Sequence, residues 1–349
     1  MPRLAALAHG RDNNFQLIRL LSATAVVLFH SYALTNHWTD EPLTLRVPEL
    51  NLGALGVACF FVISGFLVTK SWLARERVVP FVAARVLRIY PALVGAVVLS
   101  LVLAGASSSL DWGAFLSHPQ TREFVLHVAP AWAMQYRLPG AFPNNPIPYD
   151  VNGSLWTLPV ELRLYIVVLL AGLASLLARR TAWLATLCLS LALVVWHPEW
   201  FPISPYDSAT RKLVLLFGLG SLAYVWRDVI PISLALAALV LMLLVVNPAD
   251  MARGAFFPPL LAYLILVAAY HPRLQWRAFN RVGDYSYGVY VYSFPIQQIL
   301  LHRTPGLEPM PLFAMAMLLT LALAAVSWHG LEAPALRLKS RFRQPEPIR

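Results

Sequence analysis

Apolar runs of about twenty residues recur along this chain of 349 residues, and they restrict its fold more than any other feature. A helix needs about 20 apolar residues, at about 1.5 Å each, to cross a hydrocarbon core about 30 Å thick. The chain holds about ten such runs, at about 14–34, 52–72, 86–106, 154–178, 181–197, 211–227, 230–246, 255–271, 285–301 and 311–331. We therefore predict an all-helical bundle that spans a membrane about ten times, as one domain over 1–349.

The composition supports a membrane protein. Hydrophobic residues make up 58% of the chain and charged residues only 13%, whereas a soluble protein carries about 25% charge. The weak alternation of a membrane barrel is missing. A net charge of +10 could indicate nucleic-acid binding, but the positive residues lie in short loops between apolar runs. Charge that sets topology is the better interpretation, and we predict no nucleic-acid partner.

The distribution of lysine and arginine predicts the orientation in the membrane. With the N-terminus inside, the inner segments carry more than twice as many of these residues as the outer segments. This excess predicts that both termini are cytoplasmic and that the basic tail, 337–349, contacts lipid of the inner leaflet. The first run is too long for a cleavable signal and lacks a small-residue cleavage site, so we expect it to remain as an anchor.

The longest interruption between apolar runs is 107–153, which we place outside. It is rich in proline, and prolines at this density break helices and favour turns. We expect one short helix around Arg122–Tyr136, lying against the membrane. A passive cap is the default interpretation of the segment, and the alternative is that it helps to hold an acceptor.

The first run, Asn13 to Thr35, carries Arg19 and His30 in an otherwise apolar stretch. Their spacing is about three helical turns, so both side chains leave the same helix face, roughly 16 Å apart along the axis. A charged residue inside a spanning helix costs about 2.5–3.5 kcal/mol and usually faces protein or water. Imidazole can act as a general base near neutral pH. His30 could instead be a packing residue, but the face that it shares with Arg19 favours a functional role.

Glu161 lies about two turns into the span that begins near Ser154, at a depth close to that predicted for His30. A carboxylate near an imidazole can fix its tautomer and stabilise the imidazolium formed during proton abstraction. The alternatives are that Glu161 pairs with Arg163 or faces water. Arg163 is two residues further on and projects to nearly the opposite side of the helix, which disfavours that pairing.

Arg85 and Arg88 stand at the predicted inner end of the third span. Positions three apart share a helix face, so the two guanidinium groups can bind one anion, and arginine suits phosphate. Ordinary positive-inside charge with anionic lipid binding explains them equally well. Arg19, near the inner end of the first span, could join the same cluster.

Small residues mark the second span. Gly53, Gly56 and Gly65 would let helix backbones approach closely. Ser64 could be called a nucleophile, but the sequence assigns no base to it, so packing is the better interpretation.

Several aromatic residues are candidates for substrate contact. Trp156 suits an interfacial belt, and Tyr287 belongs to a tyrosine stripe that enters the ninth span. Most such stripes are packing, but we keep Tyr287 and Trp156 as candidate substrate-binding residues. Glu332, at the inner end of the tenth span, is expected to pair with a nearby arginine.

The sequence indicates no metal, since its histidines are scattered with no pair at ligand spacing on one helix. It contains no P-loop and no dinucleotide glycine fingerprint. Cys59 and Cys188 both fall in apolar runs, so no disulfide framework is implied.

Six blocks in order resemble the membrane-bound acyltransferase-3 family over about 14–336. The spacing of Arg19 and His30 matches the family's Arg-x10-His. The later blocks are FFVISGFLVTKSW, ARVLRIYPAL, NGSLWTLPVELRLY, GDYSYGVYVYSFP and SWHGLEAPALR. The chain departs from the pattern at Ser293, where many members carry histidine, so the residue at that point is not a required base.

The resemblance implies roles by position. His30 corresponds to the family's essential histidine, which works on the acceptor hydroxyl, and Arg19 is its partner in the motif. Arg85 and Arg88 match an Arg-x-x-Arg pair that is implicated in the use of the acyl donor. Glu161 matches the acidic residue of a Trp-Ser-Leu-x-x-Glu-like block.

The family moves acyl groups onto surface polysaccharides, lipopolysaccharide, peptidoglycan and related acceptors. We therefore expect a multi-pass O-acyltransferase of the bacterial cytoplasmic (inner) membrane. Its donor would be an acyl-CoA, most simply acetyl-CoA, and its acceptor an extracytoplasmic carbohydrate. The alternative is a transporter of a solute or a lipid-linked sugar, which would favour two matching halves with broken helices, and the sequence shows none. A purely structural partner would leave Arg19 and His30 unexplained.

Overall fold

The computed structural model describes residues 1–8, 10, 12–133, 135–197, 208–246, 248, 254 and 256–342. The end of the predicted basic tail, 343–349, lies outside these residues. Helix accounts for 74% of the structure, and the described residues form no strand. The prediction of an all-helical protein is therefore confirmed.

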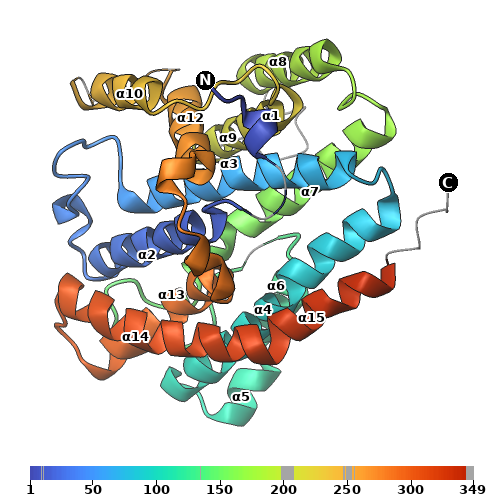
Figure 1. The fold of residues 1–349 in the computed structure, drawn as a ribbon. Coiled ribbons are helices and arrows are strands. Elements are labelled where there is room, and N and C mark those ends of the chain that lie inside the picture. The colour runs from blue at the N-terminus through green and yellow to red at the C-terminus, as the bar shows by residue number, and fades with distance from the viewer. Residues whose placement is uncertain are drawn as a thin grey trace. The chain divides into compact units, whose positions relative to one another are not determined.

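The helices follow one another along the chain with short 3₁₀ turns between them (Figure 1). The α-helices are α1 (Leu4–Leu7), α2 (Phe15–Leu34), α3 (Leu52–Leu73), α4 (Val78–Ser107), α5 (Trp112–Ser117), α6 (Pro119–Val128), α7 (Leu158–Leu173), α8 (Arg180–Trp196), α9 (Ser208–Val225), α10 (Leu234–Val246), α12 (Phe257–Tyr270), α13 (Ser286–Arg303), α14 (Pro309–Ser327) and α15 (Ala333–Arg337). A 3₁₀ turn at Gly153–Thr157 leads directly into α7, and one turn of π-helix at Trp328–Glu332 joins α14 to α15.

Each predicted span overlaps one of these helices, although the bounds differ by several residues. Within the described residues, five helical segments are long and apolar enough to cross a membrane. These segments are Phe15–Leu34, Leu52–Leu73, Val78–Ser107, Gly153–Leu173 and Pro309–Phe342. The full count of ten spans and the cytoplasmic termini stay predictions.

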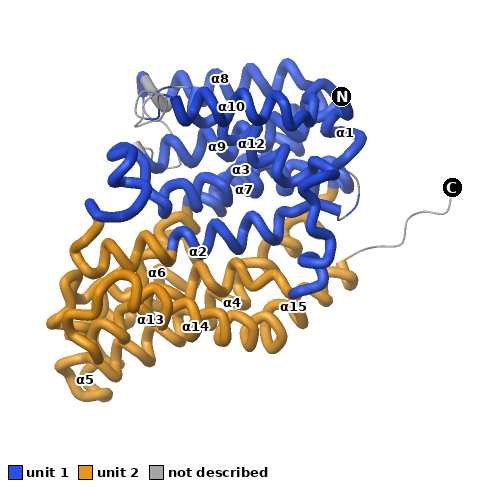
Figure 2. Tube along the Cα trace, turned by 60° about the vertical axis from the view of Figure 1, so that its left-hand side comes forward, with its two compact units in different colours: residues 1–26, 39–76, 160–282 blue, residues 27–38, 77–159, 283–349 orange. Residues whose placement is uncertain are grey.

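The chain divides into two compact units, coloured in Figure 2. Unit 1 comprises 1–26, 39–76 and 160–282, and unit 2 comprises 27–38, 77–159 and 283–349. Each unit is built from three separate stretches of chain, so no single boundary in the sequence divides them. Helix α2 is continuous and contributes its first part to unit 1 and its last part to unit 2.

Unit 1 is organised around the pair α3 and α9, with α8 and α12 packed against α9 and α10 against α12. Two glycines allow the central pair to approach. A Cβ atom at Gly65 would overlap the carbonyl oxygen of Phe217, and one at Gly220 would overlap that of Val62. A Cβ at Gly56 would lie 2.5 Å from the carbonyl oxygen of Ser22 on α2. The prediction that small residues in this span permit close packing is confirmed for Gly56 and Gly65.

Unit 2 is organised around α13, which packs against α14 and α4. A buried apolar cluster of Leu34, Phe294, Leu301 and Leu312 joins the end of α2 to α13 and α14. Burial of this kind contributes about 25 cal/mol per Å² of apolar surface. The cluster therefore fixes the end of α2 within this unit.

The proline-rich segment 107–153 is ordered by short helices and by polar contacts with α13. The single helix expected around Arg122–Tyr136 is wrong in its bounds, because α6 begins at Pro119 and ends at Val128. His118 caps α6 by accepting a hydrogen bond from the Gln120 amide, and Pro119 suits the first helical position. Pro130 then follows closely, and a proline has no N–H with which to continue the helix.

Candidate functional site

His30 lies on the part of α2 that belongs to unit 2, where it is half-buried. Its ring meets the ring of Phe294 edge-on, with 5.1 Å between the centroids. The Nδ1 atom is enclosed and has no hydrogen-bond partner among the described residues. The imidazole is thus held by an aromatic contact, and this contact does not occupy its Nδ1 atom.

A glutamine that sequence reasoning missed fixes the helix beside His30. The Gln297 side chain is fully buried, and its Nε2 donates to the Val27 carbonyl at 2.9 Å and to Ser31 Oγ at 2.7 Å. These two bonds attach α13 to α2 on either side of His30 in sequence. The signal was an amide inside an apolar run, since a buried polar group needs a partner.

Glu161 lies near the start of α7 in unit 1 and is half-buried. Its Oε1 accepts a hydrogen bond from Ser64 Oγ at 2.8 Å and a very short one from the Tyr165 hydroxyl. Ser64 and Tyr165 also bond to each other at 3.0 Å. From the sequence, Ser64 was interpreted as a packing residue. The fold gives it a carboxylate partner, Glu161, on a different helix. The spacing of residues within one apolar run cannot reveal such a partner.

Arg88, on α4 in unit 2, is bound by two carboxylates. Its Nη2 lies 2.7 Å from Asp284 Oδ2, and its Nη1 lies 3.7 Å from Glu332 Oε2. The predicted pairing of Glu332 with an arginine is confirmed. Sequence reasoning gave Asp284 no role, although an acidic residue directly before a predicted span is a signal of a buried partner.

The carboxylates of this cluster have further hydrogen bonds. Asp284 Oδ1 accepts from Ser286 Oγ at 2.5 Å, and Glu332 Oε1 accepts from Ser327 Oγ at 3.1 Å. Ser327 is also bonded to the Tyr292 hydroxyl at 2.7 Å. Each acid is therefore held by a hydroxyl close to it in the sequence as well as by Arg88.

An aromatic ring lies beside each of the two predicted arginines. The Arg88 guanidinium carbon stands 5.6 Å from the centroid of the Tyr287 ring, within the range of cation–π contacts. The Arg85 guanidinium carbon stands 5.8 Å from the Phe81 ring. Arg85, Arg88 and Tyr287 are all half-buried, so the structure brings Arg88 and Tyr287 together at one place.

Trp156 belongs to the 3₁₀ turn before α7 and is half-buried. The turn is held against α13 within unit 2, because Thr157 Oγ1 is bonded to the Tyr290 hydroxyl at 2.8 Å and Asn152 Nδ2 donates to the Val291 carbonyl at 2.8 Å. These contacts place Trp156 but show nothing that it binds.

The predicted site residues fall in both units. His30, Arg85, Arg88, Trp156 and Tyr287 belong to unit 2, whereas Arg19 and Glu161 belong to unit 1. Arg19 and His30 lie on the one continuous helix α2, as their spacing predicted. The meeting of His30 with Glu161 stays a prediction.

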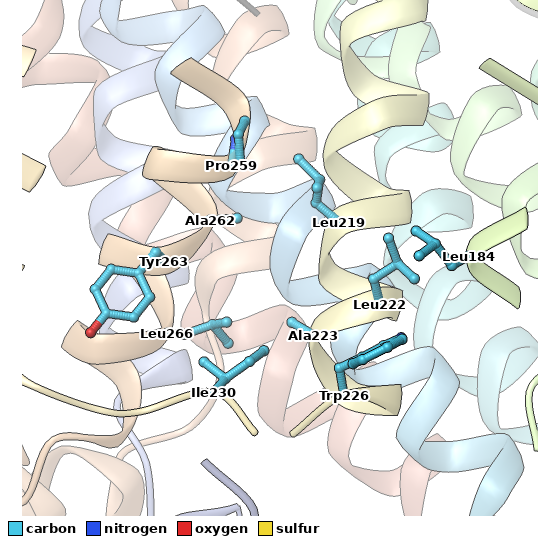
Figure 3. A pocket seen from close by; sticks show the side chains of 10 residues that line it. All are labelled: Leu184, Leu219, Leu222, Ala223, Trp226, Ile230, Pro259, Ala262, Tyr263 and Leu266. Carbon is cyan, nitrogen blue, oxygen red and sulfur yellow. The ribbon is translucent and has the colours of Figure 1, made fainter. Parts of the chain in front are cut away.

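Unit 1 contains an apolar cavity of about 390 Å³ between α8, α9 and α12 (Figure 3). Its lining includes the small residues Ala223 and Ala262 and the larger side chains of Trp226 and Tyr263. Of the lining side chains only Tyr263 carries a titratable group. This cavity offers neither a nucleophile and base pair nor a cluster of cations, so we do not place the reaction in it.

Unit 2 contains a smaller and more polar cavity, of about 250 Å³, beyond the ends of α2 and α13. Its polar lining residues are Thr35, His37, Asn144, Asn145, His302 and Glu308. No group of three or more metal-ligating side chains occurs in the parts of the chain that the structure describes.

Comparison with known proteins defines the class of this helical membrane protein as an acyltransferase enzyme. A family model described as an acyltransferase domain (acyltransferase-3) matches residues 12–329, and the chain belongs to this family. It is 28% identical to a protein of Shigella phage Sf6 named O-acetyl transferase, over 92% of this chain and 95% of the relative. It is 30% identical to Nodulation protein 10 of Rhizobium leguminosarum bv. viciae, over 95% of each chain. No solved structure matches the chain.

Proposed function

We propose that the protein transfers an acetyl group from acetyl-CoA, bound from the cytoplasm, to a hydroxyl group of a carbohydrate outside the membrane. The observation that carries the proposal is His30, an imidazole on an apolar helix long enough to span a bilayer, whose Nδ1 has no hydrogen-bond partner among the described residues. The family and the relative named O-acetyl transferase supply the class of reaction. The charge distribution supports a cytoplasmic membrane location with both termini inside.

In the proposed reaction, His30 removes the proton of the acceptor hydroxyl as its oxygen attacks the thioester carbonyl carbon. The new C–O bond forms, the C–S bond breaks, and the proton passes from the imidazolium to the leaving CoA thiolate. General base catalysis by a positioned imidazole contributes typically about 10²–10⁴-fold. We propose direct transfer, without an acyl-enzyme intermediate.

Arg85 and Arg88, with Arg19, are proposed to bind the CoA phosphates. Guanidinium groups match phosphate with two parallel hydrogen bonds. Because Arg88 already contacts Asp284 and Glu332, donor binding would exchange or share these anionic partners. The pantetheine arm would then lead from the inner side towards His30.

Glu161 is proposed to orient the His30 imidazole and to stabilise its protonated form. Support comes from its own environment, since Ser64 and Tyr165 both bond to Oε1 and hold the carboxylate in place. Tyr287 and Trp156 are proposed as substrate contacts, Tyr287 on the donor side beside Arg88 and Trp156 on the acceptor side.

Removal of the imidazole tests the proposal. His30→Ala should abolish transfer of radiolabelled acetyl from acetyl-CoA to surface glycan, while the protein remains folded in the membrane. His127→Ala is the matched control, because His127 is exposed on α6, and it should transfer normally. Normal acetylation by His30→Ala would reject the role of His30.

A second experiment separates an enzyme from a transporter. Purified protein in detergent should consume acetyl-CoA and modify an added acceptor with no membrane gradient present. A requirement for a closed membrane and a gradient would instead support transport. Rapid quenching should recover no acetylated protein, since stable labelling of His30 would indicate a covalent intermediate.

A further inference from the structure

Prolines and hydrogen bonds hold one part of the lining of the polar cavity of unit 2 in place. Asn144 and Asn145 lie between Pro143 and Pro146, whose fixed φ angles restrict that stretch. Asn145 is buried, and its Nδ2 donates to the backbone and side-chain carbonyl oxygens of Gln298 on α13, both at 2.8 Å. Among the described residues, both of its side-chain hydrogen bonds use this donor, and the residue lines the cavity.

The opposite wall is also held in place. His37 Nδ1 is 3.3 Å from Thr35 Oγ1, and His37 Nε2 is 4.0 Å from Glu308 Oε2. Pro305 and Gly306 form the turn before α14, and Gly306 has a φ of +80°, which glycine adopts without strain. A preformed cavity binds with less loss of conformational entropy than a mobile one.

We propose that this cavity binds a sugar unit of the carbohydrate acceptor, an inference that rests on the proposed function. Sugar hydroxyls donate and accept hydrogen bonds, and the asparagine, histidine, threonine and glutamate side chains here offer both kinds of partner. None of the described residues that line the cavity is lysine or arginine, so the chemistry selects a neutral polyhydroxylated ligand. Leu301 and Leu307 supply an apolar surface for the face of the sugar ring.

The cavity is connected to His30 through shared packing. Leu301 lines the cavity and also belongs to the buried cluster with Leu34 and Phe294. Phe294 in turn contacts the His30 ring. Phe294 and Leu301 are two helical turns apart on α13, which is about 10 Å. The cavity therefore holds a sugar that neighbours the acetylated one in the acceptor chain.

The volume limits the ligand as well. About 250 Å³ is below the range of about 300–1,000 Å³ that is usual for sites of drug-sized molecules. One sugar ring suits this space, and the nucleotide part of CoA does not. The sugar and the CoA nucleotide would therefore bind at different places in unit 2, the sugar in this cavity and the nucleotide at Arg88.

Kinetic measurements on variants of two exposed residues that line the cavity test the assignment of this cavity as a sugar site. The probe acceptor is an oligosaccharide cut from the host's surface polysaccharide after removal of its O-acetyl groups. Asn144→Ala and Glu308→Ala should each raise the apparent KM for this acceptor about tenfold. Hydrolysis of acetyl-CoA without acceptor, and the KM for acetyl-CoA, should not change. Arg303→Ala, an exposed neighbour that does not line the cavity, is the control.

An unchanged acceptor KM in both variants would overturn the assignment. An equal loss of acetyl-CoA hydrolysis would overturn it too, because it would indicate a structural role.

Labelling gives a measurement that does not depend on turnover. Asn144→Cys, made with Cys188→Ser, should react with a membrane-impermeant maleimide added outside, and the oligosaccharide should protect it. Arg303→Cys should react without protection. If the wild type fails to transfer acetyl groups but protection is seen, the proposed reaction fails and the sugar site stands. Equal labelling of Asn144→Cys with and without oligosaccharide would reject the site.

Discussion

Arg88 Nη2 lies 2.7 Å from Asp284 Oδ2, and both side chains are largely removed from solvent, with 21% and 8% exposed. The pair joins α4 to the segment just before α13, so it fastens these two elements of unit 2 as well as holding a candidate donor-binding group. Breaking a buried ion pair leaves one charge without compensation, which costs more than the pair itself contributes.

Asp284→Ala should therefore destabilise the protein by about 3–5 kcal/mol, because it removes the shorter of the two carboxylate contacts that Arg88 makes with Asp284 and Glu332. The double variant Arg88→Ala/Asp284→Ala should lose less than the sum of the two single losses, since either single variant already breaks the Arg88–Asp284 pair. Thermal unfolding in detergent measures both. Additive losses in the double variant would contradict the coupling.

Donor affinity should depend on the arginine pair. Arg88→Ala should raise the apparent KM for acetyl-CoA most, and Arg85→Ala should raise it less, because Arg88 also contacts Tyr287. Each charge-assisted hydrogen bond lost is worth about 1.5–3 kcal/mol, or roughly ten- to a hundredfold. Arg75→Ala serves as control, since Arg75 is exposed. An unchanged KM in Arg88→Ala would count against phosphate binding there.

Ser64 and Tyr165 should act on the reaction through Glu161. Ser64→Ala and Tyr165→Phe should each lower kcat about tenfold with little change in either KM, because they release one oxygen of the carboxylate. Ser64→Thr keeps the hydroxyl and should recover most of the activity. In a Glu161→Gln background, Ser64→Ala should have little further effect. A full additional loss there would show that Ser64 acts independently of Glu161.

Gly65→Ala should destabilise unit 1, because the added methyl group would overlap the Phe217 carbonyl oxygen. Overpacking of this kind costs typically about 1–3 kcal/mol, and more where backbone must move. Gly330→Ala is the matched control, since a Cβ there meets nothing within 4 Å. The two variants should differ clearly in melting temperature, and equal melting temperatures would contradict the packing argument.

Most of the helical architecture was predictable from the sequence, because the bilayer length sets a strong and local requirement on each apolar run. The sequence correctly predicted that α2 continues past Arg19 and His30. It also predicted the close packing at the small residues of α3. The bounds of α6 were not predicted, since its start depends on the cap at His118 and its end on Pro130. A count of apolar residues does not detect such local signals.

The sequence by itself determined that this is a helical membrane acyltransferase. It pointed to several polar residues in the apolar runs, among them Arg88 and Glu161, because each such residue is costly in lipid and stands out, but it missed Asp284 and Gln297. Only the tertiary structure decided which of them are partners. Asp284 meets Arg88, Ser64 meets Glu161, and Gln297 meets Ser31, although long stretches of chain separate each pair. Periodicity reports which face of a helix a side chain leaves, whereas a partner on another helix is fixed by how the helices pack.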